Sequence, residues 1–386
     1  MNFLFLSPHF PPHFVHFARA LKDEGMRVLG IGDVPWEALS GELQGTLAEY
    51  LHVPNLQDRD AMVRAVGYLT WRHGKMDRIE SLNEHWLLLE AELREAFHVT
   101  GLQPAEVRRL QSKYGSHLLF GQAGVPDIPT AQVTTVEALR AFGKRHGYPL
   151  VIKPEVGVGA VDAVQVRTEA ELNQRFSSPR AGLLVQPYVR GTIVTYDGVV
   201  DRAGRVCFAL SHEYSDGVME TVAEQRDISF WSLTEIPSPL RALGEKVVAA
   251  LGLRERWFHV ELFRTAPGRY VVLEANLRPP GGFMPDMMNY ACDTDVYRLY
   301  AAVVAGKDPS EWVRPARHHV CHVARRNGRA YAVSSAQLVT ELGASLLWHR
   351  EPPALFRVAM GDEMFLTRHD SLDAMHAAIR RIQQPA

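Results

Sequence analysis

This sequence has few cysteines, no excess of one charge and no long apolar run. It has three cysteines in 386 residues, and Cys207, Cys292 and Cys321 lie too far apart for a metal-ligand spacing. Few, scattered cysteines predict a reduced, cytoplasmic protein. The 42 basic and 44 acidic side chains give a formal net charge of −2, so there is no electrostatic reason to expect a nucleic acid or an anionic membrane as a partner. No apolar run is long enough to span a bilayer.

Two common phosphate-binding fingerprints and a secretory leader are also missing. The sequence has no GxxxxGKS/T segment and no GxGxxG after its first predicted strand, which excludes the P-loop and the dinucleotide fingerprint. The run MNFLFLSPHF has no basic leader or cleavage site, so we interpret it as a strand. The length of 386 residues allows two or three domains.

The first hundred residues have the pattern of an α/β domain. Strands are expected at 3–6 and 27–31, and apolar residues recur at helical spacing between them. Strand, helix and strand in this order favour a parallel sheet. Near the other end of the chain, Leu372, Met375, Ile379 and Ile382 form one stripe of a final helix. Core packing is the main interpretation of this stripe, and a partner-binding face is the alternative.

Polar residues follow a strand expected within 76–83. Glu80, Ser81, Asn83 and Glu84 lie where this strand passes into a loop and then into a helix. Ligands of parallel sheets bind outside the carboxyl ends of the strands, so these residues are candidates for one wall of a substrate site. The alternative is that they only cap the next helix, and the sequence leaves both interpretations open.

A predicted hairpin, FHVELFRTAPGRYVVLEANLRPPGGF from residue 258 onward, carries the strongest chemical signal. If Thr265 pairs with Tyr270, the antiparallel register sets Glu261 directly opposite Glu274. Side chains alternate along a strand, so Asn276 shares the face of Glu274. Facing carboxylates among apolar neighbours are destabilising, and a hard divalent cation would remove that penalty.

Two carboxylates and an amide oxygen suit Mg²⁺ held for phosphate chemistry. Arg278 follows at once and offers a fixed charge for phosphate or carboxylate oxygens. The alternative is a hairpin with two solvated carboxylates.

A second phosphate-binding device is predicted around Lys153. This lysine ends a predicted strand and is followed by PEVGVGAVD, whose glycines let backbone N–H groups approach an anion. Further on, LLVQPYV reads as a strand that contains Pro187, so it is an edge strand or is opened there. The Gln186 carbonyl and the Val189 N–H could then meet a flat heterocycle. An ordinary turn and an ordinary edge strand are the alternatives.

Three histidines, His9, His13 and His16, follow the first predicted strand. Zinc binding is conceivable there, but no fourth ligand is evident. Lining the mouth of the first domain, or packing against nearby phenylalanines, is the favoured interpretation.

Together these segments resemble the ATP-grasp superfamily, most closely its carboxylate–amine ligase branch, which includes the L-amino-acid ligases. The resemblance rests on IESLNEHWL, the helix with Lys113, YPLVIKPEVGVGA, LVQPYVRG and HVELFRT…YVVLEANLRPPGG. It implies an N-terminal Rossmann-like α/β domain at 1–100. A two-lobed α+β ATP-grasp fold would follow, with the small lobe at 101–190 and the large lobe with a C-terminal extension at 191–386.

The resemblance also implies roles for individual residues. Lys113 and Lys153 would bind the nucleotide phosphates, and Lys153 and Arg278 would serve catalysis. The remaining assignments are a phosphate loop at Gly157, Gly159 and Ala160, adenine-edge contacts at Gln186, Tyr188 and Val189, a ribose contact at Asp197, Mg²⁺ or Mn²⁺ ligands at Glu261, Glu274 and Asn276, and further substrate contacts at Arg278, Gly281 and Gly282.

The chain departs from the family at three positions. The family usually has a glutamate where Gln186 or Pro187 stands, often an acidic ribose contact near Ile193, and commonly a serine at Ala160. The implied function is an ATP-dependent ligase that activates a small carboxylate, such as an amino acid, and joins it to an amine. A carboxylase, a small-molecule kinase and an inactive nucleotide-binding module are the alternatives, and a homodimer is expected by frequency.

Overall fold

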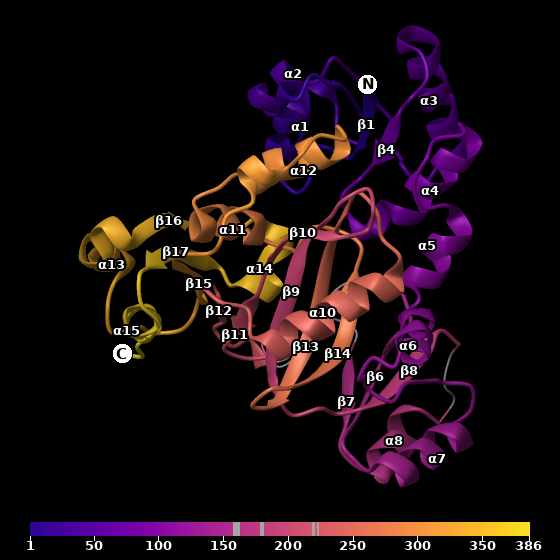
Figure 1. Cartoon of the computed structure of the whole chain (residues 1–386). Coiled ribbons are helices and arrows are strands. Elements are labelled where there is room, and N and C mark those ends of the chain that lie inside the picture. Colours follow the sequence, from indigo (N-terminus) through magenta and orange to yellow (C-terminus); the bar gives the residue numbers. More distant parts are fainter. Residues whose placement is uncertain (157–162, 178–180, 218–220, 222–223) are drawn as a thin grey trace.

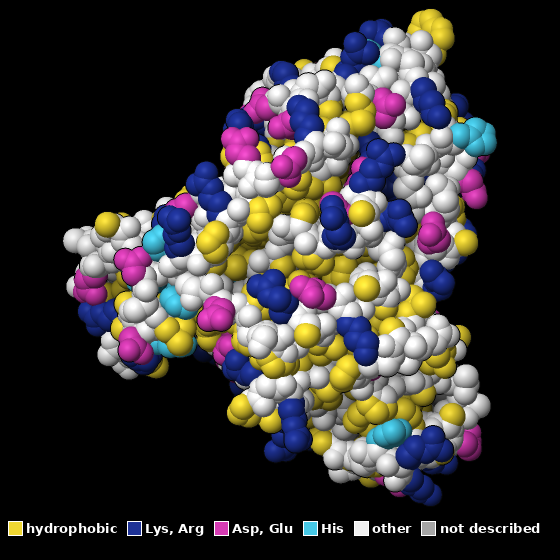
Figure 2. All heavy atoms as spheres, in the orientation of Figure 1, with side chains coloured by type: hydrophobic (Ala, Val, Ile, Leu, Met, Phe, Trp, Pro, Cys, Tyr) yellow, Lys and Arg dark blue, Asp and Glu magenta, His cyan; other side chains and the backbone are white. Residues whose placement is uncertain are grey.

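The computed structural model describes the chain except for residues 157–162, 178–180, 218–220 and 222–223 (Figure 1). The strands of the described residues form three sheets, of four, nine and four strands. Among the described residues, no helix is both long and apolar enough to cross a membrane. Figure 2 shows acidic and basic side chains scattered together over the face that it presents.

The first sheet is parallel, as predicted, and has the strand order β3-β2-β1-β4. Its strands form where apolar residues run without interruption, and Phe3 to Leu6 are completely buried. The elements of this part are β1 (Asn2–Leu6), α1 (Phe14–Asp23), β2 (Arg27–Gly32), η1 (Trp36–Ala38), α2 (Gly41–Thr46), β3 (Glu49–His52), α3 (Arg59–His73), β4 (Arg78–Glu80), η2 (Glu84–Trp86) and α4 (Leu87–Ala96).

A helical connection leads to the small antiparallel sheet, with the order β5-β8-β6-β7. The connection starts at Pro104, which needs no N–H partner in a first helical turn. The elements are α5 (Pro104–Gln111), α6 (Lys113–Gln122), β5 (Ala131–Gln132), α7 (Val136–His146), β6 (Leu150–Pro154), β7 (Val164–Val166), α8 (Glu169–Arg175) and β8 (Leu183–Pro187).

Pro187 lies on an interior strand that is open beside the proline, which is the second of the two predicted alternatives. β8 lies between β5 and β6, and Pro187 pairs with Leu150 of β6. On its other side β5 pairs only with Leu184 and Val185, so this side of β8 is open at Pro187. The proline therefore removes no ladder hydrogen bond on that side.

The large sheet is antiparallel and has the order β14-β13-β9-β11-β12-β15-β17-β16, with β10 paired to β9. Its strands are β9 (Thr192–Val200), β10 (Val206–Leu210), β11 (His212–Tyr214), β12 (Ser229–Ser232), β13 (Arg256–Ala266), β14 (Arg269–Asn276), β15 (His319–Arg325), β16 (Leu346–Arg350) and β17 (Glu363–His369). The helices around it are α10 (Ser238–Leu251), α11 (Met284–Cys292), α12 (Val296–Val304), η3 (Ser310–Trp312), α13 (Ser335–Leu342), η4 (Gly343–Ser345), α14 (Ala354–Met360) and α15 (Leu372–Ile382).

Both faces of β9 and β13 are covered by apolar residues. Val199 and Trp257 point into a core that also contains residues of α1, α11 and α12. Val200 and Phe258, next to them in sequence, point into the core beneath α10. The N-terminal domain therefore shares its core with the large sheet, and Figure 1 shows α12 lying between them.

The hairpin of β13 and β14 pairs as predicted at the end that carries the acidic residues. Glu261 lies opposite Glu274, but Tyr270 pairs with Arg264 instead of Thr265. One register shift lies near the turn and another beside Glu261. The extra residue is on β13 at the first shift and on β14 at the second, so the two offsets cancel.

The final helix buries most of its predicted stripe. Met375 and Ile382 are completely buried in a core with Trp231 and Phe365. Leu372 is 44% exposed at the first helical position, so its inclusion in the stripe was wrong.

Candidate active site

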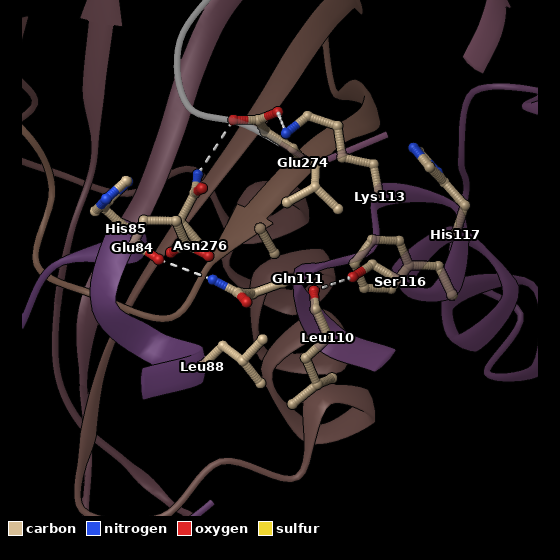
Figure 3. Close-up of a pocket in the computed structure, with 13 residues that line it drawn as sticks. Glu84, His85, Leu88, Leu110, Gln111, Lys113, Ser116, His117, Glu274 and Asn276 are labelled. Carbon is tan, nitrogen blue, oxygen red and sulfur yellow. Dashed lines mark hydrogen bonds and ion pairs between the residues drawn. The ribbon is translucent and has the colours of Figure 1, made fainter. Parts of the chain in front are cut away.

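A cavity of about 260 Å³ lies between the start of α4, the α5–α6 pair and the end of β14 (Figure 3). Most of its polar lining comes from the segments that the sequence singled out. The lining residues are Glu84, His85, Leu88, Leu110, Gln111, Lys113, Ser116, His117, Phe120, Val156, Glu274, Ala275 and Asn276.

Glu274 is the electrostatic centre of this cavity. Lys113 Nζ lies 3.3 Å from its Oε2 atom, and Asn276 Nδ2 lies 3.3 Å from Oε1. Burial alone would raise the pKa of Glu274, but Lys113 and Lys153 act against it and hold the pKa at about 2. The carboxylate is therefore ionised and balances two lysines that the sequence placed on a phosphate site.

Lys153 is only 8% exposed at the end of β6. Burial lowers its pKa, and the nearby charge of Lys113 lowers it further, whereas Glu274 and Glu261 raise it. A buried lysine in this setting gains from every additional anion, so the site is suited to a phosphate chain.

The candidate metal ligands Glu261, Glu274 and Asn276 lie on one face of the hairpin. Glu261 faces Glu274 across the strands, and its Oε1 atom is 2.9 Å from His259 Nε2. In the part of the chain that the structure describes, no three His, Cys, Asp or Glu side chains gather as a metal site. The set here is two carboxylates and one amide, which are oxygen donors of the kind that Mg²⁺ and Mn²⁺ bind, so the residues fit the predicted ion.

Glu84 connects the cavity to the segment after β14. Its carboxylate accepts from the Leu277 N–H at 3.3 Å. Burial raises the pKa of Glu84, and the charges of Arg278 and Arg256 partly oppose this. Arg278 donates to the Pro279 carbonyl at 2.8 Å, so its guanidinium is held against the bend that Gly281 and Gly282 complete.

The other predicted wall residues lie elsewhere. Asn83 caps η2 by accepting from the His85 N–H at 3.1 Å, as in the capping alternative. Glu80 and Ser81 are buried behind the cavity and do not line it, which corrects the prediction that they form a substrate wall. Of the four predicted residues, Glu84 is the one on the cavity.

Glu80 belongs to a buried ionic cluster that the sequence did not predict. Arg256 contacts Glu80 at 2.9 Å and Glu90 at 2.6 Å, and Arg94 contacts the same two carboxylates at 3.0 and 2.8 Å. Ser81 also donates to Glu90, and Arg256 Nε donates to the Leu277 carbonyl at 2.8 Å. The cluster thus ties the N-terminal domain to the residue that follows Asn276.

Comparisons with known proteins find relatives with the same fold. An L-arginine-specific L-amino acid ligase from Bacillus subtilis is 20% identical over 253 residues, which are 63% of this chain and 61% of that protein. The crystal structure of an L-amino acid ligase from Bacillus licheniformis matches with a TM-score of 0.76 at 16% identity, covering 99% of this chain and 96% of that one. This chain has the ATP-grasp fold.

A further ATP-grasp match is the biotin carboxylase domain of a Hydrogenobacter thermophilus 2-oxoglutarate carboxylase, solved with MgADP, ADP and bicarbonate. Its TM-score is 0.68 at 17% identity, covering 97% of this chain and 89% of that chain. No protein-family model matches the sequence. The chain matches 61% of the length of the Bacillus subtilis ligase, which is less than two thirds. The predicted fold and the predicted resemblance to L-amino-acid ligases are thus confirmed.

Gln186, where the sequence departs from the ATP-grasp pattern, has two side-chain neighbours in the structure. Gln186 Nε2 lies 3.0 Å from His117 Nε2 and donates to Thr130 Oγ1 at 2.8 Å. The other ring nitrogen of His117 lies 2.6 Å from Asp127 Oδ1. In a neutral His117 ring that donates Nδ1–H to Asp127, Nε2 accepts, and a glutamine supplies the donor that a glutamate would lack.

Gln186→Glu is therefore expected to lower the free energy of unfolding by about 1–3 kcal/mol at pH 7.5, because a buried acceptor would face another acceptor. Urea unfolding would measure the effect, with Gln57→Glu on the surface as the matched control. Equal stability of Gln186→Glu and the control would contradict the assigned donor role.

The remaining nucleotide predictions have different outcomes. Tyr188 donates its backbone N–H to Pro149 at 2.9 Å, and Val189 follows directly, so their contact with adenine stays a prediction. Gly157, Gly159 and Ala160 lie outside the described residues. Asp197 is completely buried, with Oδ1 2.6 Å from His259 Nδ1 and Oδ2 3.0 Å from His212 Nδ1. No part of it is presented to a ribose, so that prediction is corrected.

The histidines after β1 do not form a metal site among the described residues. His13 packs against the rings of Phe14 and Phe283, with centroids 5.2 and 6.3 Å away. His9 Nε2 lies 3.2 Å from Asp33. His13 thus packs against aromatic rings, as in the favoured interpretation.

Proposed function

We propose that this chain is an ATP-dependent, ADP-forming ligase. It would activate a small carboxylate, an amino acid in particular, as an acyl-phosphate and join it to an amine. The observation that carries the proposal is the convergence of Lys113, Glu274 and Asn276 at one cavity. The charge of Lys153 also acts on Glu274, and Glu261 faces Glu274 across the strands. Two lysines whose charges act on one half-buried carboxylate, with Lys113 in contact with it, suit an anionic ligand such as a phosphate chain.

In this proposal Lys113 and Lys153 bind phosphate oxygens of ATP. Glu261, Glu274 and Asn276 would hold magnesium, which neutralises negative charge that develops on the phosphates. Arg278 would steady the acyl-phosphate or the departing phosphate through two parallel hydrogen bonds. No protein nucleophile is required, because catalysis rests on position and charge.

The reaction has two balanced steps. A carboxylate oxygen of the substrate attacks the γ-phosphorus of ATP, a new O–P bond forms, and ADP leaves with the electrons of the broken bond. The amine nitrogen then attacks the acyl carbon, the C–O bond to phosphate breaks, and inorganic phosphate leaves with one carboxylate oxygen. The proton lost by the amine ends on phosphate or solvent. Exclusion of water protects the acyl-phosphate between the steps.

A bicarbonate-dependent reaction is the second candidate, because the carboxylase neighbour was solved with MgADP and bicarbonate. Products separate the candidates, since only the amide-forming ligase releases an amide together with ADP and phosphate.

The test is a phosphate-release screen with ATP, magnesium and the twenty standard amino acids in pairs, repeated with bicarbonate. The expected result is phosphate release that depends on a particular pair and yields a dipeptide. Release that needs bicarbonate would favour the carboxylase, and the absence of any turnover would favour an inactive nucleotide-binding module.

We also propose a cytoplasmic location and a homodimer. The location is inferred from three cysteines that are all free thiols, as expected in a reducing compartment. The dimer is inferred from the frequency of symmetric homodimers among enzymes.

Arg278→Lys is expected to keep nucleotide binding, which depends on Lys113, Lys153 and the metal ligands. It should lower ligation by on the order of 100-fold, because lysine cannot reproduce a planar, bidentate contact. The measurement compares the thermal shift caused by ADP with turnover in the same variant. Equal loss of both, or loss of neither, would remove Arg278 from the proposed mechanism.

A further inference from the structure

A second group of polar side chains lies between the segment after β1 and the start of α11. Asp286 and His13 are only 7% and 6% exposed, and Asp286 Oδ2 and the Nδ1 atoms of His13 and His16 are buried without a hydrogen-bond partner among the described residues. Buried polar atoms are nearly always paired, and an unpaired one costs about 1–3 kcal/mol. Each of these atoms lacks a partner in the protein, and a bound polar ligand would supply one.

Contacts between rings bring these atoms together from distant parts of the chain. The His16 ring lies 5.3 Å from the ring of Tyr297, and the Tyr297 hydroxyl donates to Asp286 Oδ1 at 3.0 Å. His13 lies 6.3 Å from Phe283, which directly precedes α11. One oxygen of Asp286 is thus fixed by the protein, and the other is left for a partner.

Arg350 completes the group with the opposite charge. Its guanidinium carbon lies 3.9 Å from the centre of the Trp348 ring and 4.3 Å from that of Phe283. Arg350 is the last residue of β16 and is exposed. Stacking fixes the plane of the guanidinium and leaves its N–H groups free for an anion.

The charges in this group act on one another. Burial, together with the charges of His16 and Arg350, lowers the pKa of His13 to about 3, so this imidazole is neutral and one ring nitrogen can accept. Burial raises the pKa of Asp286 to about 6, with Tyr297 and Arg350 opposing the shift. At neutral pH the group thus offers an anionic oxygen, a neutral acceptor and a cation.

We propose that this group binds the amine substrate as an amino-acid zwitterion, with its ammonium on Asp286 Oδ2 and the neighbouring histidine nitrogens and its carboxylate on Arg350. The proposal rests on the ligase function above. α11 begins immediately after the Arg278–Gly282 bend, so a ligand on Asp286 would lie on the segment that continues from the phosphate site. A carboxylic acid without an amine would pair with Arg350 alone, and an amine without a carboxylate would pair with Asp286 and the histidines alone.

The test is binding to the full chain without ATP, measured by saturation-transfer NMR with pools of the twenty standard L-amino acids. At least one is expected to bind, and its carboxamide analogue should bind more weakly by on the order of tenfold, which corresponds to about 1.4 kcal/mol. Asp286→Asn and Arg350→Gln should each weaken the same amino acid by a similar factor. Asp308→Asn and Arg381→Gln, which change exposed side chains, are the matched controls.

The ADP-induced thermal shift reports whether each variant is folded, and Arg350→Gln changes an exposed side chain, so the test does not depend on one substitution. Failure of all twenty amino acids to bind, or unchanged binding in either Asp286→Asn or Arg350→Gln, would overturn the proposal. Because this measurement needs no turnover, its failure is distinguishable from failure of the phosphate-release screen.

Discussion

Substituting Glu274 by glutamine is expected to lower ATP-dependent turnover by on the order of 100-fold or more. The amide keeps the shape of the side chain but removes the charge that balances Lys113 and Lys153 and that would bind magnesium. Turnover at saturating magnesium measures the effect, and Glu224→Gln, an exposed carboxylate, is the control. Near-normal turnover of Glu274→Gln would remove this residue from the proposed site.

The same substitution should also reduce the free energy of unfolding, by about 1–3 kcal/mol. The pKa of Glu274 falls from its ordinary value of 4.5 to about 2 in the folded protein. A lowered pKa means that the ionised group stabilises the fold, that this stabilisation is present above the unfolded value, and that it is lost as pH falls toward 2. Two facing carboxylates alone would have predicted the opposite effect of the substitution, but the two lysines outweigh their repulsion.

Arg256→Met should lower the free energy of unfolding by about 3–5 kcal/mol, because it leaves Glu80 and Glu90 with one arginine in a buried site. Chemical denaturation would measure the loss. The substitution should also remove the hydrogen bond from Arg256 Nε to the carbonyl of Leu277, the residue next to Asn276.

Two further variants make this prediction sharper. Arg298→Met, at an exposed ion pair with Asp23, should change stability by at most about 1 kcal/mol. Adding Glu80→Gln to Arg256→Met should recover part of the loss, since one buried charge is then removed. A loss in Arg256→Met no larger than in Arg298→Met would show that the cluster does not stabilise the junction.

The chemistry of the hairpin could be predicted from the sequence because it depends on local rules. Alternation along β14 put Asn276 beside Glu274, and antiparallel pairing put Glu261 opposite. The pairing of Tyr270 with Thr265 was predicted wrongly, because the bulge at Thr265 depends on how the strand packs against its neighbours. The facing pair survived this error because the second bulge cancels the first.

The ionic cluster could not be predicted, since Arg256 lies far along the sequence from its partners Glu80 and Glu90. Glu90 and Arg94, at i and i+4 on α4, look like an exposed surface pair in the sequence. Only the docking of α4 against β13 reveals Arg256 as their partner. The ribose contact predicted at Asp197 failed for the same reason. Sheet pairing brings His212 and His259 to Asp197 and buries the carboxylate that the family resemblance had suggested for a nucleotide.

The most direct test of the ligase mechanism follows one oxygen atom. A pool of amino acids with ¹⁸O in their α-carboxylates would be incubated with ATP, magnesium and the enzyme, and the products analysed by mass spectrometry. Activation as an acyl-phosphate predicts ADP and inorganic phosphate that carries one ¹⁸O per amide bond formed. Label in AMP, with release of pyrophosphate, or amide formation with unlabelled phosphate, would contradict it.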